Sequence, residues 1–180
     1  MTMAQDTVTR IDADELGTIA TQLAELLVDA VDGGASVGFL APLDRAVAAA
    51  WWRTHTDALA AGSRALWTAR TGGRITGTIS VGFATYPNGG HRAEIAKLLV
   101  HRDARGRGLG RTLLSTAERA AADAGVTLLH LDTETGSPAE SLYRRAGWTP
   151  AGVIPDYAAD PAGELRPTTL FYKRLARPGQ

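Results

Sequence analysis

The stretch RDARGRGLGR, Arg102 to Arg111, determines how the rest of the sequence is interpreted. It places Gly106, Gly108 and Gly110 at alternate positions among four arginines. Glycines let a backbone approach a ligand closely and adopt turns that other residues disfavour. Consecutive N–H groups at the start of a helix, helped by the helix dipole, bind anions. The stretch therefore predicts a loop that holds an anionic group.

The residues on either side of this loop predict a strand before it and a helix after it. The segment AEIAKLLV, residues 93–100, is apolar and short, which is typical of a buried strand. A helix is predicted from Gly110 to Ala124, and Gly125 ends it. The loop therefore joins the carboxyl end of a strand to the amino end of a helix.

The rest of the chain alternates between the helical and the strand period. Helices are predicted over 12–31, 42–60 and 137–147, and strands over 64–70, 74–86, 126–134, 148–158 and 168–175. The order α-α-β-β-β-α-β-α-β-β indicates a mixed-sheet α/β (α+β) fold with helices flanking the sheet. With 180 residues and 44% hydrophobic content, we expect a single domain over 1–180. Short flexible ends are expected at about 1–8 and 176–180.

Composition excludes several classes of function. Lys and Arg number 19 and Asp and Glu number 19, so the chain lacks the basic excess of a nucleic-acid binder. The absence of cysteine excludes disulfides, cysteine-ligated zinc and thiol catalysis. No spacing of histidines and carboxylates suggests a metal site. No leader and no apolar run of about 18 residues is visible, so we expect a cytoplasmic protein that does not associate with membranes.

Three glycine-rich motifs compete for the loop. The P-loop needs a Gly-Lys pair, which this chain lacks. The dinucleotide motif G-x-G-x-x-G needs a different spacing and the first βαβ unit, although Asp132 does follow about 20 residues later. The third motif, R/Q-x-x-G-x-G/A, matches residues 105–110, RGRGLG. At these residues the sequence resembles the GNAT acetyltransferase superfamily, over about Ala93 to Tyr143 and in the order of all its elements.

The resemblance implies a GNAT fold whose splayed strands bind acetyl-CoA. The loop would hold the pyrophosphate, the arginines would add charge-assisted contacts, and a backbone N–H at a β-bulge would polarise the thioester carbonyl. It implies these acetyl-CoA-binding residues: Leu98, Leu99, Val100, Arg105, Gly106, Arg107, Gly108, Leu109, Gly110, Arg111 and Ser137.

Longer segments narrow the resemblance. The segments VDGGASVGFLAPLD (31–44), NGGHRAEIAKLLV (88–100), LLHLDTETGSPAESLY (128–143) and ELRPTTLFYKRL (164–175) resemble tabtoxin-resistance acetyltransferases. Those enzymes acetylate the amino group of a β-lactam amino-acid toxin. The likeness implies a small amino-acid-like amine as acceptor, and antibiotic or toxin inactivation as the role. Ser36 and Phe39, in the segment 33–39, would shape the acceptor pocket together with Glu94 and Asp132.

Three residues are candidate catalysts. The family places a tyrosine at the position of Tyr143, where a phenol with a pKa near ~10 can protonate the departing thiolate. Glu94 lies on the strand before the loop, and Asp132 lies on the strand after the loop helix. Either one could deprotonate or anchor the amine. His130 lies in LLHLD and is predicted to be a core histidine, whereas His91 and His101 are predicted to be solvated.

Two other functions remain open. A protein or peptide N-acetyltransferase would need an open groove for an extended chain. A non-catalytic acetyl-CoA-binding module would need no catalytic residues, and the presence of Tyr143, Glu94 and Asp132 argues against it. Without a cysteine to carry the acyl group, direct transfer is expected. A homodimer is compatible with the sequence.

Overall fold

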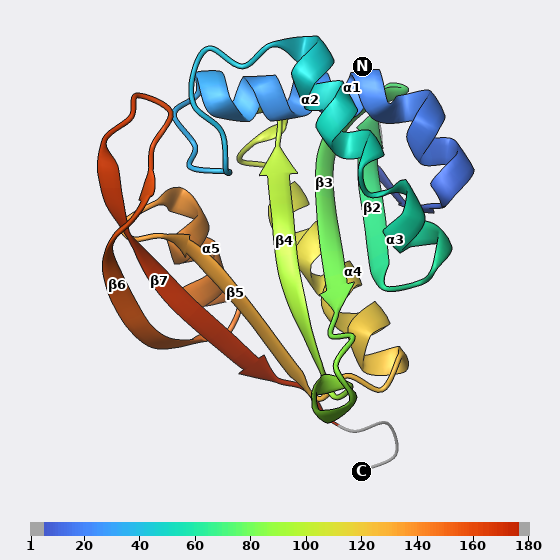
Figure 1. The fold of residues 1–180 in the computed structure, drawn as a ribbon, viewed down its shortest axis with the longest axis vertical. Helices are drawn as coiled ribbons and strands as arrows, with labels where there is room; N and C mark the ends of the chain where they lie inside the picture. The colour runs from blue at the N-terminus through green and yellow to red at the C-terminus, as the bar shows by residue number, and fades with distance from the viewer. Residues whose placement is uncertain (1–5, 177–180) are drawn as a thin grey trace.

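The computed structural model describes residues 6–176, which form one mixed sheet with helices on both faces (Figure 1). The seven strands lie in the order β1-β2-β3-β4-β5-β7-β6. The helices are α1 (Ala13–Asp32), α2 (Arg45–Arg53), α3 (Thr56–Ala60), α4 (Leu109–Asp123) and α5 (Pro138–Arg145), with 3₁₀ turns η1 (Pro87–Gly89) and η2 (Arg102–Ala104). The strands are β1 (Thr7–Ile11), β2 (Arg64–Thr71), β3 (Arg74–Phe83), β4 (Arg92–Val100), β5 (Leu128–Glu134), β6 (Thr149–Ala159) and β7 (Leu165–Arg174).

Two hydrophobic cores hold the helices against the sheet. On one face, α4 and α5 pack on the sheet through a core that includes Leu113, Leu114 and Leu129. On the other face, α1 packs on β3 and β4 through a core that includes Leu23 and Leu27. Helix α2 packs against α1 and adds Trp52 to this core. Within residues 6–176 no helix is both long and apolar enough to cross a membrane.

Strands β4 and β5 separate soon after they meet, which divides the sheet into two halves. They pair in parallel only at Arg92–Leu128, Ala93–Leu129 and Glu94–His130. Beyond Glu94, β4 continues beside β3, while β5 continues beside β7, and Figure 1 shows the two halves diverging. The predicted mixed-sheet fold with splayed strands is therefore confirmed.

Local capping explains where helix α1 begins. The side chain of Asp12 accepts a hydrogen bond from the Glu15 N–H at 2.8 Å, and the Glu15 carboxylate accepts one from the Asp12 N–H at 3.2 Å. This reciprocal pair satisfies backbone donors that the first turn leaves free. Helix α1 thus starts where the sequence predicted.

The amino-terminal prediction was wrong in part. Residues 7 and 8 were assigned to a flexible end, but they belong to β1, which pairs antiparallel with β2 from Thr7–Arg70 to Ile11–Leu66. The segment TVTRI is mostly exposed at the edge of the sheet, so it lacks the apolar alternation that marks a half-buried strand. Residues 1–5 and 177–180 of the predicted flexible ends lie outside the described residues.

The single helix predicted over 42–60 is instead two helices. The Asp44 side chain accepts hydrogen bonds from the N–H groups of Ala46 and Val47, so α2 begins after it and Pro42 is outside the helix. The Thr54 hydroxyl donates to the Trp51 carbonyl at 2.7 Å, and α3 starts afresh at Thr56. Side-chain bonds of this kind compete with the helical ladder.

Candidate active site

The arginine-glycine loop ends at the amino terminus of α4. Gly106 and Gly108 have φ angles of 75° and 81°, a left-handed conformation that side chains disfavour. Gly108 is the N-cap of α4 and contributes no side chain there. The N–H groups of the first turn have no acceptor within the helix, so they are free to bind an anion. This is the arrangement that the sequence predicted.

The other glycine of the motif allows close packing. A Cβ on Gly110 would lie 3.4 Å from Leu142 Cδ1 and 3.7 Å from Val100 Cγ2. The start of α4 therefore lies directly against α5 and the end of β4. Leu99 and Leu109 are buried, whereas Leu98 and Val100 are half-buried and lie beyond the point where β4 leaves β5.

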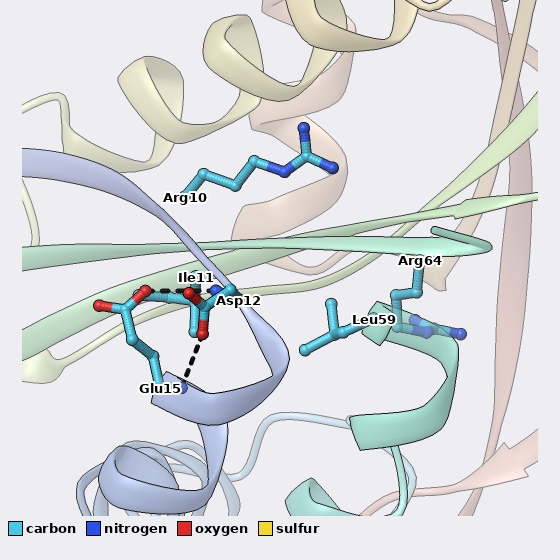
Figure 2. A pocket seen from close by; sticks show the side chains of 6 residues that line it. All are labelled: Arg10, Ile11, Asp12, Glu15, Leu59 and Arg64. Atoms are coloured by element: carbon cyan, nitrogen blue, oxygen red, sulfur yellow. Dashed lines mark hydrogen bonds between the residues drawn. The ribbon is translucent and has the colours of Figure 1, made fainter. Parts of the chain in front are cut away.

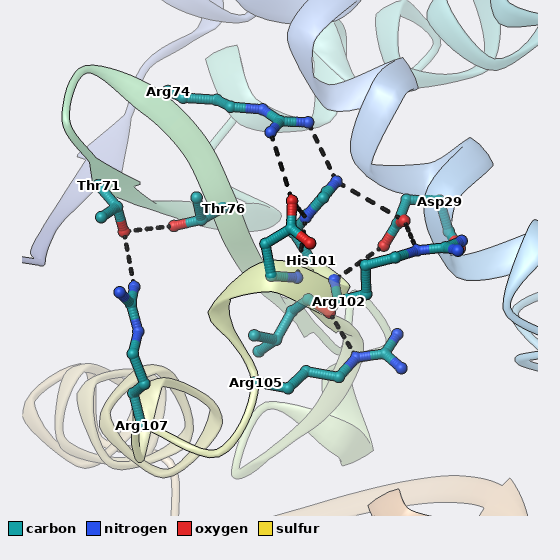
Figure 3. Close-up of polar contacts among 10 residues, drawn as sticks. Asp29, Thr71, Arg74, Thr76, His101, Arg102, Arg105 and Arg107 are labelled. Atoms are coloured by element: carbon teal, nitrogen blue, oxygen red, sulfur yellow. Dashed lines mark hydrogen bonds and ion pairs between the residues drawn. The ribbon is translucent and has the colours of Figure 1, made fainter.

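Three arginines of the loop besides Arg102 contact the protein, and Figure 3 shows two of them, Arg105 and Arg107. Arg105, Arg107 and Arg111 are exposed, yet each donates hydrogen bonds to other residues. The acceptors are the Val100 carbonyl for Arg105 (3.0 Å), Asp6 Oδ1 and Thr71 Oγ1 for Arg107 (3.0 and 3.1 Å), and the Arg145 carbonyl for Arg111 (3.1 Å). They keep positive charge beside the loop, while the backbone supplies the free donors.

Helix α1 fastens the start of the loop through Asp29, whose side chain is 9% exposed. Its Oδ2 accepts a hydrogen bond from the Arg102 N–H at 3.1 Å, its other oxygen accepts from the Arg102 guanidinium, and that guanidinium also donates to the Asp29 carbonyl at 3.2 Å. Figure 3 shows this cluster between α1 and the end of β4. The loop is therefore held by charge-assisted bonds as well as by the chain itself.

His101 joins the same cluster, so its predicted solvation was wrong. It is 8% exposed, its Nδ1 accepts from the Asp103 N–H at 3.2 Å, and its Nε2 lies 3.0 Å from an Arg74 nitrogen. The histidine follows the last residue of β4 directly, where α1 covers the chain. Its ring therefore fills the space between α1 and the loop.

Strand β4 carries a bulge at the point where the two halves of the sheet have parted. Thr78 of β3 pairs with Leu99 and Ser80 pairs with Ala96, so Lys97 and Leu98 together lie opposite a single residue. Lys97 has a φ of 51°. A bulge disrupts the ladder locally and re-aims the backbone. The resemblance implied a bulge at residues 98–100, and the bulge begins one residue earlier, at Lys97.

The two candidate carboxylates lie on the two strands that part, Glu94 on β4 and Asp132 on β5. Glu94 is the last residue of β4 that pairs with β5, and Asp132 is two residues beyond the corresponding position on β5. Their neighbours Ile95 and Leu131 are buried in the core beneath α4 and α5. Strand alternation therefore directs both carboxylates to the opposite face. Glu94 is half-buried and Asp132 is exposed.

The prediction that His130 is a core residue was wrong. It is exposed and pairs in register with Glu94, whereas Leu129 and Leu131 on either side of it are buried. Because side chains alternate along a strand, a histidine between two core leucines faces the other way. Its apolar sequence neighbours concealed this.

Tyr143 lies on α5 and belongs to the core that Ile95 and Leu131 also enter. It is 6% exposed and packs against Trp148 and Phe171, with ring centroids 5.8 and 6.1 Å away. Its hydroxyl makes no hydrogen bond to any other of residues 6–176. Burial, and secondarily the negative charge of Asp132, raise the pKa of Tyr143. The phenol is therefore protonated at neutral pH and its proton is available to a ligand.

Helix α5 is held by its first turn. The Ser137 hydroxyl accepts from the Glu140 N–H at 3.2 Å, so it is the N-cap of α5. The Glu140 carboxylate does not form a capping box with Ser137 but accepts from the Gly136 N–H at 2.6 Å, Arg144 at 2.8 Å and Thr169 at 3.1 Å. The Gly136 bond first, and Arg144 next, lower the pKa of Glu140.

Replacing Glu140 with glutamine is expected to destabilise the protein by about 2 kcal/mol at neutral pH, because buried bonds to a charged acceptor are lost. Since the folded-state pKa of Glu140 is lowered, its contribution is complete above the ordinary glutamate pKa of ~4.3 and disappears as pH falls through the folded value. Urea unfolding from pH 7 to pH 3 measures this. The control Glu164→Gln, at a carboxylate 68% exposed, should change little at any pH.

Sequence reasoning missed Lys97, which is next to the segment implied to shape the acceptor pocket. Its Nζ lies 5.2 Å from the centroid of the Trp51 ring, and a Cβ on Gly38 would lie 3.8 Å from that nitrogen. Phe39 packs edge-on against Trp51 at 5.4 Å, and Ser36 is half-buried in the same loop. The available signal was a lysine that interrupts the apolar run of β4.

The two halves of the sheet are joined on this side by a loop contact. The Ala41 N–H, in the segment between α1 and α2, donates to the Pro161 carbonyl between β6 and β7 at 2.9 Å. Figure 1 shows this hairpin loop reaching toward the α1–α2 segment. The contact closes one end of the space between the parted strands.

A surface pocket lies at the start of α1, beside β1, β2 and α3. It is lined by Arg10, Ile11, Asp12, Glu15, Leu59 and Arg64 (Figure 2). Its two carboxylates form the cap of α1, so they are already occupied. Elsewhere in residues 6–176, no group of three or more histidine, aspartate or glutamate side chains could hold a metal ion.

Comparison with known proteins agrees with this geometry. The model of the acetyltransferase (GNAT) family matches residues 39–148. An N-acetyltransferase from Staphylococcus aureus superposes with a TM-score of 0.78 at 16% identity, covering 96% of this chain and 100% of that one. A phosphinothricin acetyltransferase from Sinorhizobium meliloti in complex with acetyl-CoA gives 0.75 at 20%, covering 95% and 89%. A ribosomal-protein-alanine N-acetyltransferase from Brucella melitensis gives 0.72 at 22%, covering 94% and 99%.

The likeness to these structures establishes the fold, and the family match spans well over half of the chain. The matched residues include β4, the arginine-glycine loop, β5 and Tyr143. The chain therefore belongs to the acetyltransferase (GNAT) family, a family of acetyl-CoA-dependent N-acetyltransferases.

Proposed function

We propose that this protein transfers an acetyl group from acetyl-CoA directly to the amine of a small amino-acid-like acceptor, with tabtoxinine-β-lactam as the type of acceptor and toxin inactivation in the cytoplasm as the role. The observation that carries the proposal is the Tyr143 hydroxyl. It belongs to a buried side chain, makes no hydrogen bond within residues 6–176, and has its pKa raised in part by the negative charge of Asp132.

The residues present fit acetyl-CoA. The free N–H groups at the start of α4 and the positive charge of Arg105, Arg107 and Arg111 suit a pyrophosphate. The bulge at Lys97–Leu98 supplies a re-aimed backbone N–H for a carbonyl. Acetyl-CoA would supply an activated acyl group, and the chain's own residues would position it, move protons and exclude water.

Acetyl transfer from acetyl-CoA to the acceptor requires one bond to form, one to break and protons to move. A C–N bond forms to the acceptor amine and the C–S bond breaks. The acceptor ammonium loses two protons. One passes to a carboxylate, directly or through a water, and then to solvent. The other leaves the nitrogen as the C–N bond forms, and it replaces the proton that Tyr143 gives to the departing sulfur. Direct transfer needs no acyl-enzyme, which agrees with a chain that has no cysteine.

We assign proton acceptance to Asp132 and anchoring of the ammonium to Glu94. Asp132 lies on β5, the strand that α5 contacts, and its negative charge helps to raise the pKa of Tyr143. These observations favour Asp132 as the partner of the proposed acid. Glu94, at the point where the strands part, lies where an ammonium would be held.

Replacing Asp29 with asparagine should raise the KM for acetyl-CoA about tenfold while kcat changes little. The variant loses the charge that holds Arg102, and a bond to a charged group contributes about 1.5–3 kcal/mol. Steady-state thiol release at varied acetyl-CoA measures this. Asp103→Asn, which removes an exposed carboxylate from the same turn, is the matched control and should leave the KM unchanged. An equal effect of both variants would contradict the role given to Asp29.

Thiol release with a panel of acceptors tests the proposed function. We expect turnover with amino-acid-like antibiotics and toxins, and little with extended peptides. Lack of turnover with tabtoxinine-type acceptors alone would remove the narrow proposal and keep the broad one. Turnover on peptides alone would identify a protein N-acetyltransferase. Binding of acetyl-CoA without turnover of any amine would identify a non-catalytic module and overturn the proposal.

We also propose a homodimer that forms through β6. This strand is the edge of the sheet, and its large apolar side chains Val153, Ile154 and Tyr157 are 55%, 40% and 50% exposed. Large apolar side chains that gather in an exposed patch often mark a contact with another protein molecule. Light scattering should give twice the mass of the chain, and Ile154→Lys should give the monomer. A monomeric wild-type protein would overturn the proposal.

A further inference from the structure

A lysine beside the proposed acceptor site carries a charge that the protein leaves unpaired. Lys97 is half-buried and makes no ion pair and no hydrogen bond within residues 6–176. It is held by the Trp51 ring at 5.2 Å and by the close approach of Gly38. The left-handed backbone of Lys97 aims the side chain at these two residues instead of along the strand. The bulge therefore presents an ammonium to the α1–α2 segment.

An arginine on β2 is in the same situation. The Arg64 guanidinium lies across Gly82, where a Cβ would be 3.6 Å from Nη2, and it donates to Ser80 Oγ at 3.1 Å. Within residues 6–176 no carboxylate lies within ion-pair distance of it. Ser80 in turn donates to the Ala96 carbonyl, which ties Arg64 to the segment of β4 that carries the bulge. The guanidinium is thus fixed in place but electrostatically unpaired.

Strand register places these cations on the same face as the candidate carboxylates. Arg64 pairs with Gly82, and Gly82 pairs with Glu94. Two strand spacings separate the backbones of Arg64 and Glu94, which is about 10 Å. Both Glu94 and Asp132 interact electrostatically with Lys97. A single small molecule can therefore reach both the cations and the carboxylates.

The electrostatics around Lys97 favour an incoming anion. Burial first, and the charge of Arg64, lower the pKa of Lys97, while Asp132 and Glu94 oppose this decrease. His55 packs against Trp51 at 4.5 Å, and burial followed by Arg64 lowers the pKa of His55, so the ring is neutral at neutral pH. Desolvating a cation without a counterion is costly, and a bound carboxylate would offset that cost.

We propose that Lys97 and Arg64 form an anion subsite that binds the carboxylate of a zwitterionic acceptor, while Glu94 and Asp132 bind its amine. This deepens the proposed function and rests on it, because the subsite selects the acceptor of that reaction. The substrate class is then a free amino acid or an amino acid analogue with an acidic group close to the amine. Polyamines and amino sugars lack the anion and are excluded.

Binding of acetate tests the subsite without any turnover. Acetate is the probe because it carries only the carboxylate, and the indole NMR signal of Trp51 reports on Lys97. We expect a saturating shift in the wild-type protein, and at least a tenfold increase in the dissociation constant for Lys97→Met, which keeps the aliphatic chain beside Trp51. Arg64→Gln keeps a donor for Ser80 and should weaken acetate severalfold. The control Arg53→Gln removes an exposed cation from α2 and should change nothing.

A second arm separates this proposal from the proposed function. The wild-type enzyme should acetylate an amino acid acceptor at least tenfold faster, in kcat/KM, than its α-carboxamide, and Lys97→Met should abolish that preference. If no amine is turned over while acetate still binds at Trp51, the proposed function fails and the subsite remains. If acetate does not bind, or binds equally to Lys97→Met, the subsite is overturned.

Discussion

Replacing Tyr143 with phenylalanine should lower kcat about 100-fold, with nearly unchanged KM values for acetyl-CoA and acceptor. A positioned general acid contributes roughly 10²–10⁴-fold, and we take the lower bound because water can protonate a thiolate slowly. Phenylalanine keeps the ring that packs on Trp148 and Phe171. Since the hydroxyl makes no hydrogen bond within residues 6–176, the thermal unfolding midpoint should not fall.

Steady-state thiol release at saturating acetyl-CoA measures this effect. The matched control is Tyr172→Phe, which removes the hydroxyl of a half-exposed tyrosine on β7 and should leave kcat unchanged. A Tyr143→Phe variant that retains most of its kcat would show that the phenol is not the acid. Its burial would then be a matter of packing alone.

Replacing Asp132 with asparagine should lower kcat/KM for the acceptor about 100-fold near neutral pH, by loss of a general base. The loss should shrink as the pH rises toward the pKa of the acceptor amine, because a free amine needs no base. Glu94→Gln should act differently and raise the KM for the acceptor more than it lowers kcat. Its loss is one of anchoring, which ground state and transition state share.

The pH–rate profiles of the two variants decide the assignment. If Asp132→Asn loses the same factor at every pH, Asp132 does not take the proton. If Glu94→Gln shows the loss that fades with pH, the two roles are exchanged. Because both side chains are close to isosteric with the originals, thermal unfolding of each variant serves as the control for folding.

The central third of the molecule was predictable because its chemistry is local. The loop from Arg105 to Gly110 needs left-handed glycines before a helix, and that requirement is visible in sequence. The helices that begin after the N-caps Asp12 and Ser137 were likewise predicted, because a cap depends on neighbours three residues away. These features depend little on distant parts of the chain.

The rest depends on contacts between distant residues. Strand β1 is stabilised by pairing with β2, not by its own pattern. The exposure of His130 and the burial of His101 follow from which face of the sheet each helix covers. Lys97 is placed by a bulge set by its register with β3, and its importance appears only with Trp51 and Gly38 beside it. Such long-range arrangements are not encoded by local periodicity.

A structure of the protein with acetyl-CoA bound tests the account most directly. We expect the pyrophosphate to lie against the backbone N–H groups of residues 105–110. We expect the thioester to lie between the parted strands β4 and β5, with its sulfur within hydrogen-bond distance of the Tyr143 hydroxyl. Acetyl-CoA bound elsewhere, or a thioester sulfur out of reach of Tyr143, would contradict it.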